Sequence, residues 1–454
     1  MLGGEHPASP IHAVTSPVDR LVDTKGDLIG ARQKFRGSKT MMSHTFSESH
    51  SAIRSRFPSL GRIGPEGKAW VHLDGPGGTQ VPASVAAAIS ESIIMANANR
   101  GAAFHSSALV DELMARAGSL CADFFGIDDP RRVIFGPNMT TLAFHLADAI
   151  VPELSPGDEI VVSRLDHDAH VSPWLHAARR SGATVRHLDF CRHSFTLQPD
   201  MLARVIGPRT RLIGFTAASN ALGSLVPVKE LIKVARTTNA IVSIDGTHFA
   251  PHLLPEVDSW DADFFFCSAY KFFGPHVGIM AGKINWLESL NPARVRPAGE
   301  KLPVRWMTGT QNHEGIAGLV AALEYLAELG DDQGGFRSRL QSAYQRIAGH
   351  EANLTRIFFE RLRTQNSWKL IGPNQSDPTT RVATFALSGP VPPRQAAEAL
   401  AKRGICSYSG NFYALPVTEA LGIESSGGLL RVGAVHYNTA EEIHRLWDAL
   451  DAIS

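Results

Sequence analysis

From residue 132 onward, short apolar runs alternate with longer segments in which apolar residues recur every three to four positions. The short runs, such as VIFG, LIGF and IVSID, are bounded by turn residues, which is typical of buried strands. The longer segments, such as 139–154 and 227–239, have the period of amphipathic helices. Strands that alternate with helices predict an α/β fold, in which a parallel or mixed sheet is covered by helices on both faces.

The same pattern predicts how the chain is divided. Residues 1–45 are polar and show no sustained period, so we expect a disordered N-terminal extension. Residues 71–330 carry the alternating strands and helices and should form a large domain. After a polar, Gly-rich break, residues 331–454 should form a smaller α+β domain, against which residues 46–70 are expected to pack.

Composition excludes several classes of protein. The net charge is zero, which argues against nucleic acid or an anionic membrane as a partner. No apolar run reaches the length of about 18 residues that a membrane-spanning helix needs. The four cysteines lack CxxC spacing, so we expect no metal site and no disulfide framework, and a reducing cytoplasm suits the chain. These cysteines are Cys121, Cys191, Cys267 and Cys406.

Two charged residues stand at the ends of predicted buried strands. Asp245 ends the run IVSID, and Lys271 ends DADFFFCSAYK, 26 residues later (271 − 245 = 26). Such charges are costly to bury, and ligands of α/β sheets bind outside the carboxyl ends of the strands. The two residues therefore predict a binding site, although an acid in a turn and a lysine on the surface remain the alternative.

A lysine and an acid in this arrangement suit a pyridoxal phosphate (PLP) enzyme, in which lysine forms a Schiff base and the acid keeps the pyridine nitrogen protonated. Residues 138–141 open a helix directly after a strand, where backbone N–H groups can hold a phosphate, although Asn138 would cap that helix in any case. Ser268 can add a hydroxyl. Arg431 lies in an apolar run and needs an anion, either a structural acid or a substrate carboxylate.

Several motifs together extend this interpretation, namely DGPGGTQVP, LDHDAHVSPW, ASNALGSLVPVKEL, SIDGTHFAPH, CSAYKFFGP, TGTQNHEG and RVGAVHYNT. With them the chain resembles the class V aminotransferase family of fold-type I PLP enzymes, and within it the cysteine desulfurase-like and selenocysteine lyase branch. The resemblance covers about residues 70–450. It implies a large domain with a mostly parallel sheet and a smaller α+β C-terminal domain.

The resemblance implies roles for the matching residues. Lys271 falls on the Schiff-base lysine, and Asp245 falls on the acid at the pyridine nitrogen. His167 falls on the histidine that stacks on the ring and moves protons, although a plain loop histidine is the alternative. Arg431 falls on the arginine that binds the substrate carboxylate.

Further matches concern the cofactor alone. Asn220 and His248 fall beside the PLP hydroxyl, and His248 stands where many desulfurases carry glutamine. The phosphate contacts fall on Met139, Thr140, Ser268, Tyr270 and Thr310. Thr310 matches a residue that reaches the cofactor of a partner subunit, so the resemblance implies a homodimer. Tyr270 stands where desulfurases have histidine, and its hydroxyl can still donate a hydrogen bond.

One departure from the family bears on the reaction. Desulfurases take the substrate sulfur on a mobile cysteine, and the matching position here is Tyr413. Cys406 lies seven residues earlier (413 − 406 = 7), and we expect it to be a packed thiol rather than a nucleophile.

The predicted function is therefore a PLP-dependent reaction on an amino acid, in which Lys271 removes the α proton. Cleavage of a C–S bond in a cysteine-like substrate is the first hypothesis. Epimerisation or transamination is the second, and a PLP-binding protein with little turnover is the third. The residues do not choose between the first two, whereas intact Lys271, Asp245 and Arg431 argue against the third.

Overall fold

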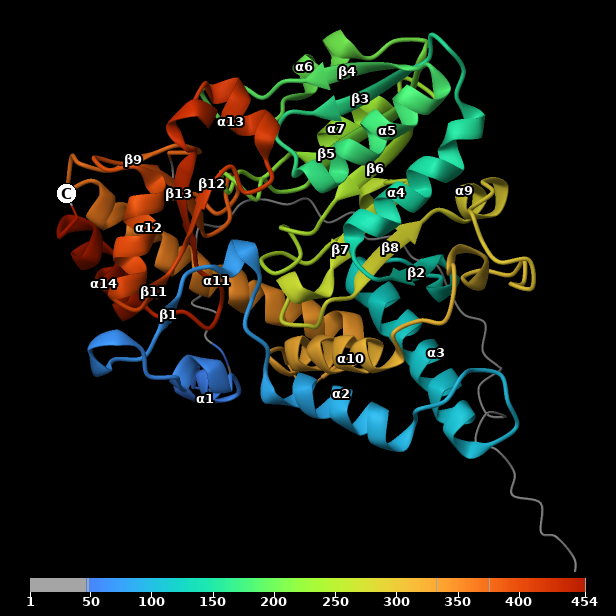
Figure 1. The fold of residues 1–454 in the computed structure, drawn as a ribbon, viewed down its shortest axis with the longest axis horizontal. Helices are drawn as coiled ribbons and strands as arrows, with labels where there is room; N and C mark the ends of the chain where they lie inside the picture. The colour runs from blue at the N-terminus through green and yellow to red at the C-terminus, as the bar shows by residue number, and fades with distance from the viewer. Residues whose placement is uncertain (1–45, 47–48, 332, 375, 454) are drawn as a thin grey trace, which may run out of the picture. The chain divides into compact units, whose positions relative to one another are not determined.

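A seven-stranded sheet, in the order β2-β8-β7-β6-β5-β3-β4, forms the largest layer of the computed structural model (Figure 1). Strands β3 to β7 run parallel, whereas β8 is antiparallel to both β7 and β2. The strands are β2 (Val133–Gly136), β3 (Glu159–Ser163), β4 (Thr184–Leu188), β5 (Thr210–Thr216), β6 (Ile241–Asp245), β7 (Phe264–Ser268) and β8 (Gly278–Gly282). Every residue of β3, β6, β7 and β8 is buried, which explains why these runs are continuously apolar rather than alternating.

The structure describes residues 46, 49–331, 333–374 and 376–453. The predicted extension 1–45 lies outside the described residues. The described residues all belong to one compact unit of the chain.

A second, antiparallel sheet follows in the C-terminal part, in the order β12-β13-β10-β9. Its strands are β9 (Lys369–Leu370), β10 (Thr384–Ser388), β12 (Tyr408–Gly410) and β13 (Leu429–Gly433). A hydrophobic cluster separate from that of the large sheet lies beneath it, built around Phe358, Phe385 and Trp447. The mostly parallel sheet and the smaller C-terminal sheet confirm the predicted fold class.

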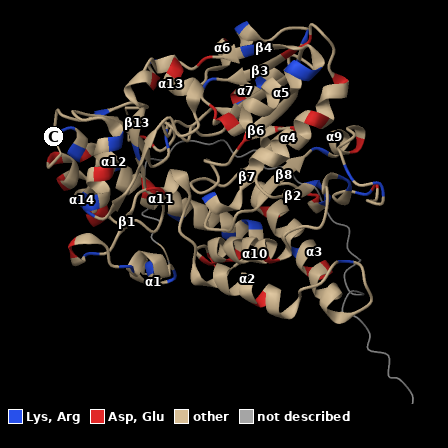
Figure 2. Ribbon diagram, in the orientation of Figure 1, with Lys and Arg blue, Asp and Glu red and all other residues tan. Residues whose placement is uncertain are grey.

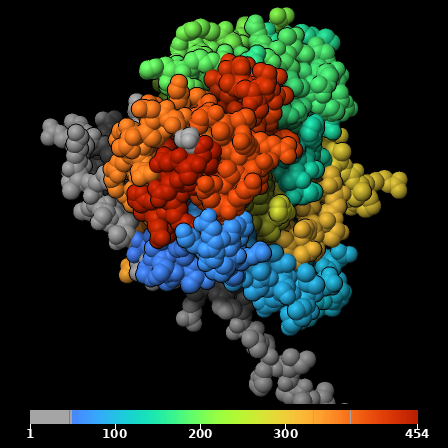
Figure 3. Space-filling view, turned by 60° about the vertical axis from the view of Figure 1, so that its left-hand side comes forward, coloured from blue at the N-terminus to red at the C-terminus, as the bar shows by residue number. Residues whose placement is uncertain are grey.

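The first strand of the chain does not join the large sheet. Strand β1 (Val71–His72) pairs in parallel with β11 (Ile405–Cys406), more than three hundred residues later in the chain. Residues just before β1 also contact the C-terminal part, as Figure 3 shows. His50 Nε2 lies 2.9 Å from the carbonyl oxygen of His436, and Arg54 forms an ion pair with Glu442 at 2.9 Å.

Helices cover the sheets, and α10 packs against α2 and α3 (Figure 1). The helices are α1 (His50–Ser55), α2 (Ala83–Met95), α3 (His105–Phe125), α4 (Met139–Ile150), α5 (Ser172–Ser181), α6 (Pro199–Val205), α7 (Val228–Ala235), α8 (Val257–Trp260), α9 (Ile284–Ser289), α10 (His313–Glu328), α11 (Phe336–Leu362), α12 (Pro393–Lys402), α13 (Leu415–Leu421) and α14 (Ala440–Asp451). Three short 3₁₀ turns matter for the site, namely η3 (Gly75–Gly77), η6 (Asp168–His170) and η7 (Ala269–Lys271).

Acidic and basic residues are interspersed along the elements (Figure 2). Among the described residues, no helix has the length and apolar character needed to cross a membrane.

Candidate active site

A cavity of about 930 Å³ lies where the carboxyl ends of the large sheet meet β12 and β13. Several residues that the sequence singled out line it together, namely Thr140, His167, Asn220, Tyr270, Lys271 and Arg431. They come from segments separated by almost three hundred residues, so the fold has brought them into one place.

Lys271 ends the turn η7, which follows strand β7 directly. Its side chain is buried, and Nζ donates a hydrogen bond to the carbonyl oxygen of Pro76 in η3. Burial and the nearby guanidinium of Arg431 lower the pKa of Lys271 to about 7, although the carboxylate of Asp245 opposes this shift. A substantial fraction of the amine is therefore neutral near pH 7, and only a neutral amine is a nucleophile or a base.

Asp245 is the last residue of β6 and pairs with Phe266 of β7. The side chain is buried, and Oδ1 accepts a hydrogen bond from the backbone N–H of Thr247 at 2.8 Å. Asp245 forms no ion pair with any lysine or arginine in the described part of the chain. Because no such ion pair within the described residues offsets the loss of solvent, burial raises the pKa of Asp245. Such an acid suits a cationic partner that the protein does not itself supply.

The N-terminus of α4 lies beside β7. The Asn138 side chain caps the helix by accepting from the backbone N–H of Thr141 at 2.8 Å. The backbone N–H of Met139 donates to the hydroxyl of Ser268 at 3.1 Å, so these two predicted phosphate contacts bind each other. Thr140 faces the cavity at the positive end of the helix dipole, where an anion is stabilised.

Arg431 lies in the middle of β13 and is buried. Its Nη1 donates to the carbonyl oxygen of Asn220 at 2.9 Å, and Nε has no hydrogen-bond partner among the described residues. Its Cζ lies 4.3 Å from the ring centroid of Phe412 and 5.7 Å from that of Tyr408. Burial lowers the pKa of Arg431 to about 9. Since the described residues include no acid that forms an ion pair with Arg431, the geometry favours an external anion over a structural one.

His167 precedes η6, and its Nδ1 accepts from the backbone N–H of Ala169 at 3.0 Å. Burial, Lys271 and Arg431 lower the pKa of His167 to about 4, so the ring is neutral at neutral pH. Because Nδ1 accepts, the remaining ring proton is on Nε2. The imidazole is nearly parallel to the ring of Tyr413, with an interplanar angle of 19° and centroids 5.6 Å apart.

The 408–413 segment lines the cavity from the C-terminal sheet, opposite the ends of the large-sheet strands, and has unusual backbone geometry. Phe412 and Tyr413 have φ angles of 57° and 56°, in the left-handed region that large side chains rarely adopt. Two contacts hold this conformation. The Asn220 amide donates to the carbonyl oxygen of Phe412 at 2.9 Å, and the Asp168 N–H donates to that of Tyr413 at 2.6 Å.

The aromatic contacts of Arg431 are the part of the site that sequence reasoning missed. The density of aromatic residues in YSGNFY was the available signal.

Other predicted residues do not line the cavity. His248 is buried, and its Nε2 lies 3.1 Å from the hydroxyl of Thr384. Thr310 is exposed in the loop before α10. Asp245, Met139 and Ser268 are buried behind the cavity wall.

Comparison with known proteins decides the family. The family model described as aminotransferase class-V matches residues 71–446 of this chain. The chain belongs to the class V aminotransferase family. This confirms the family predicted from the motifs, and 71–446 agrees with the extent expected from them.

The similar curated proteins of this family have varied names. An uncharacterized protein of Mycobacterium tuberculosis, MT3887, is 30% identical, over 88% of this chain and 98% of the relative. A probable cysteine desulfurase of Pseudomonas putida is 29% identical, over 88% of this chain and 97% of the relative. An aminotransferase-like protein of Gibberella zeae, FGM3, is 28% identical, over 91% of this chain and 100% of the relative.

Solved structures agree with this assignment. The cysteine desulfurase CsdA of Escherichia coli matches with a TM-score of 0.76 and 25% identity, over 89% of this chain and 98% of the CsdA chain. A cysteine desulfurase of Thermococcus onnurineus has a TM-score of 0.78 at 22% identity, over 89% and 97%, and supports the fold.

Proposed function

We propose that this chain is a PLP-dependent enzyme that cleaves the C–S bond at the β carbon of a cysteine-like amino acid. The observation that carries the proposal is one cavity that combines the amine of Lys271, the guanidinium of Arg431 and, behind its wall, the carboxyl of Asp245. Relatives named as probable cysteine desulfurases support the class of reaction.

The cofactor of the proposed reaction is pyridoxal phosphate, and the residues present fit it. Asp245, buried without a cationic partner in the described chain, would hold the protonated ring nitrogen. The neutral imidazole of His167 would cover the ring, and Thr140 at the start of α4 would hold the phosphate. Bound through Lys271, PLP supplies an electron sink that stabilises negative charge on the α carbon of the substrate.

The substrate is bound and deprotonated by residues of this chain. Arg431 binds the α-carboxylate, because its guanidinium is buried and forms no ion pair within the described residues. Lys271 takes the α proton on Nζ, since burial and Arg431 keep much of this amine neutral near pH 7. The Nε2 proton of His167 is available to the leaving group on the same cavity wall.

Tyr413 determines the proposed fate of the sulfur. It stands where desulfurases of the family are expected to carry a cysteine, and no cysteine is among the residues that line the described cavity. A phenol cannot take a sulfur atom as a persulfide. We therefore propose that sulfur leaves to solvent as sulfide or thiol, and that the free half-buried Cys406 takes no part in this step.

We also propose a homodimer in which Thr310 reaches the cofactor of the partner subunit. Thr310 is exposed and lies outside the cavity of its own chain. Apolar side chains of α2 and the loop after it are exposed, namely Ile93, Ile94, Met95 and Phe104, and α2 packs against α10, the helix that follows Thr310. Sedimentation at several concentrations tests the dimer. A reducing cytoplasm suits cysteines that are all free.

The second candidate is epimerisation or transamination of an amino acid. The same absence of a cavity cysteine in the described residues favours it, because neither reaction needs a thiol. A relative named as an aminotransferase-like protein supports it.

The deciding experiment supplies the PLP-loaded enzyme with a panel of amino acids and measures sulfide, pyruvate, keto acids and D-amino acids together. We expect sulfide or pyruvate from cysteine-type substrates, at the same rate in Cys406→Ser. Solvent deuterium at the α carbon without either product would instead establish the epimerase. Sulfide release that disappears in Cys406→Ser would refute the proposed role of Tyr413.

A further inference from the structure

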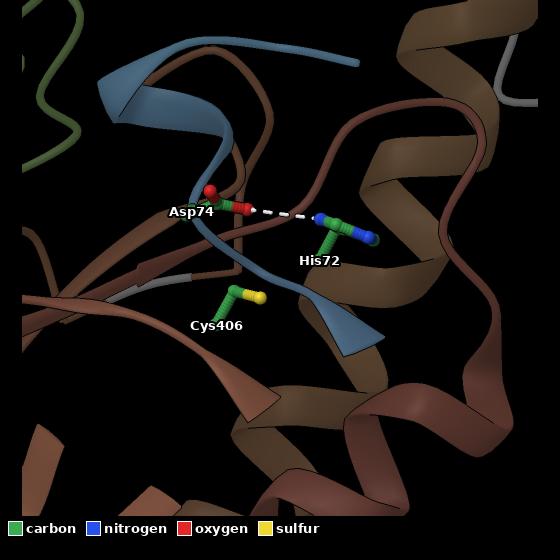
Figure 4. Close-up of side chains that lie close together, drawn as sticks. All are labelled: His72, Asp74 and Cys406. Carbon is green, nitrogen blue, oxygen red and sulfur yellow. Dashed lines mark ion pairs between the residues drawn. The ribbon is translucent and has the colours of Figure 1, made fainter. Parts of the chain in front are cut away.

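A group of three side chains lies outside the active-site cavity, where β1 pairs with β11. The parallel register places His72 directly beside Cys406, and Asp74 follows two residues later. A ring nitrogen, the thiol sulfur and a carboxylate oxygen all lie within 4.8 Å of one another. Figure 4 shows imidazole and carboxylate facing each other, with the thiol reaching them from the neighbouring strand.

The backbone around this cluster is held by hydrogen bonds from three other segments. The N–H of Val71 donates to the carbonyl oxygen of Gly404 at 2.8 Å, and the N–H of Gly433 donates to that of Leu73 at 2.7 Å. The Asn438 amide donates to the carbonyl oxygen of His72 at 2.9 Å. The three side chains are therefore presented from a fixed frame, which reduces the entropy lost when a ligand binds.

Within the cluster, His72 and Asp74 are joined only by an ion pair that is longer than a hydrogen bond. Both ring nitrogens of His72 and Oδ1 of Asp74 are buried and make no hydrogen bond to any described residue. His72 Nδ1 lies 3.7 Å from Asp74 Oδ1, beyond the length of a hydrogen bond. Buried polar atoms are almost always satisfied, so three such atoms around one point indicate a ligand.

We propose that His72, Asp74 and Cys406 bind a divalent thiophilic cation of the Zn²⁺ class. Imidazole nitrogen, carboxylate oxygen and thiolate sulfur are the donors that Zn²⁺ takes in proteins. One carboxylate and one thiolate balance its double charge. Three protein ligands leave a fourth position for water. Cys406 is only half-buried, so water can reach this position from the side of its thiol.

The competing occupant is a proton on His72. Burial lowers the pKa of His72, but Asp74 and Cys406 outweigh it and raise the pKa to about 9. An imidazolium would satisfy the carboxylate without any metal, so the experiment must separate the two.

The site adjoins the active-site cavity through both of its strands. Asp74 leads into η3, where the carbonyl of Pro76 accepts from Lys271 Nζ. Cys406 leads into β12, whose Tyr408 lies over the guanidinium of Arg431. A bound cation would tie β1 to β11 and hold these two edges of the cavity.

The test dialyses the PLP-loaded enzyme against buffered free Zn²⁺ and measures metal per chain by mass spectrometry. Cys406→Ser and His72→Gln are compared with Cys191→Ser, which removes another half-buried free thiol away from the cluster. We expect about one Zn²⁺ more per chain in wild type and Cys191→Ser than in the two cluster variants. Loss of an outer partner of a metal ligand costs 10- to 100-fold in affinity, so loss of a ligand should cost at least about 100-fold.

A second measurement needs no cluster variant. Zn²⁺ should slow alkylation of Cys406 by N-ethylmaleimide in wild type, read by peptide mass spectrometry, and leave the alkylation of Cys191 unchanged. Equal zinc in wild type and Cys406→Ser, or unaltered alkylation of Cys406, would overturn the proposal and leave a protonated His72 in its place. The PLP absorbance of each variant shows that it has folded.

Discussion

Two regions of this molecule reach the same cavity in different ways. Asp245 and Lys271 stand at the ends of the neighbouring, fully buried strands β6 and β7. The 408–413 segment reaches the cavity from the C-terminal sheet, with Phe412 and Tyr413 in strained backbone conformations and Tyr413 largely exposed. The first region is held by the core, whereas the second is held by a few hydrogen bonds to Asn220 and Asp168.

This difference separates two parts of the chemistry. The strand ends place charges in a low-dielectric setting that shifts their pKa values, and in the proposed reaction these charges activate the α carbon. The 408–413 segment covers Arg431 and carries Tyr413, which in our proposal decides the fate of the leaving group. Substitutions at the strand ends should therefore abolish all reactions together, while those in the segment should change rates and substrates.

The largest effect is expected from Lys271→Ala. Without its amine the enzyme has neither the covalent attachment for PLP nor the base, so turnover should fall by about 10⁴-fold or more. The absorbance of bound PLP and product formation are the measurements. Lys283→Ala is the control, because Lys283 is paired with Asp263 at 3.1 Å away from the cavity. Near-normal turnover in Lys271→Ala would contradict the role of the strand ends.

Asp245→Asn should lower turnover by about 100- to 1000-fold, the usual cost of removing one preorganised electrostatic partner. The apoprotein should nevertheless melt at a higher temperature at pH 8. Burial raises the pKa of Asp245 above its unfolded value, so stability falls as pH rises from the ordinary pKa of about 4 through the folded one. Calorimetry at pH 8 and pH 5 checks this, with a smaller difference expected at pH 5. A lower melting temperature at pH 8 would show that Asp245 stabilises the empty site.

Arg431→Gln should lower kcat/KM by about 10- to 100-fold, because a charged hydrogen bond to the carboxylate is lost. It should also change Lys271. In wild-type apoprotein the rate of covalent PLP uptake should rise with pH through about 7, since only the neutral amine attacks the cofactor. Loss of the guanidinium should move this midpoint to higher pH, followed by absorbance. The control is Arg394→Gln, whose side chain is 88% exposed, and an unchanged midpoint would contradict the coupling.

The smallest effect is expected from Phe412→Leu. The ring lies 4.3 Å from the Arg431 guanidinium, and a cation–π contact is worth about 0.5–2 kcal/mol. We expect KM for the amino acid to change by about 3- to 10-fold, with PLP absorbance unchanged. Tyr413→Phe keeps the stacking on His167 and serves as the matched control. A loss of PLP binding in Phe412→Leu would instead show that the 408–413 segment, like the strand ends, is needed to bind the cofactor.

Local pattern was enough to predict much of the site. Buried strands that end in a charge identified Asp245 and Lys271, because a charge after an apolar run is visible in a few residues of sequence. Arg431 was visible because it is a charge inside an apolar run. The bond between Met139 and Ser268, and the position of His248 behind the wall, depend on how strands and helices pack, and no local pattern encodes them.

The sequence by itself determined the α/β architecture, the family and the two charged strand ends, since periodicity and short motifs carry that information. Only the tertiary structure decided what covers Arg431, how Phe412 and Tyr413 are held, and that His72 meets Cys406. Those contacts join segments far apart in the chain, and their formation depends on strand pairing and packing of the whole fold. For this reason the lack of CxxC spacing led to the expectation of no metal site, while the β1–β11 pair brings a nitrogen, an oxygen and a sulfur donor together.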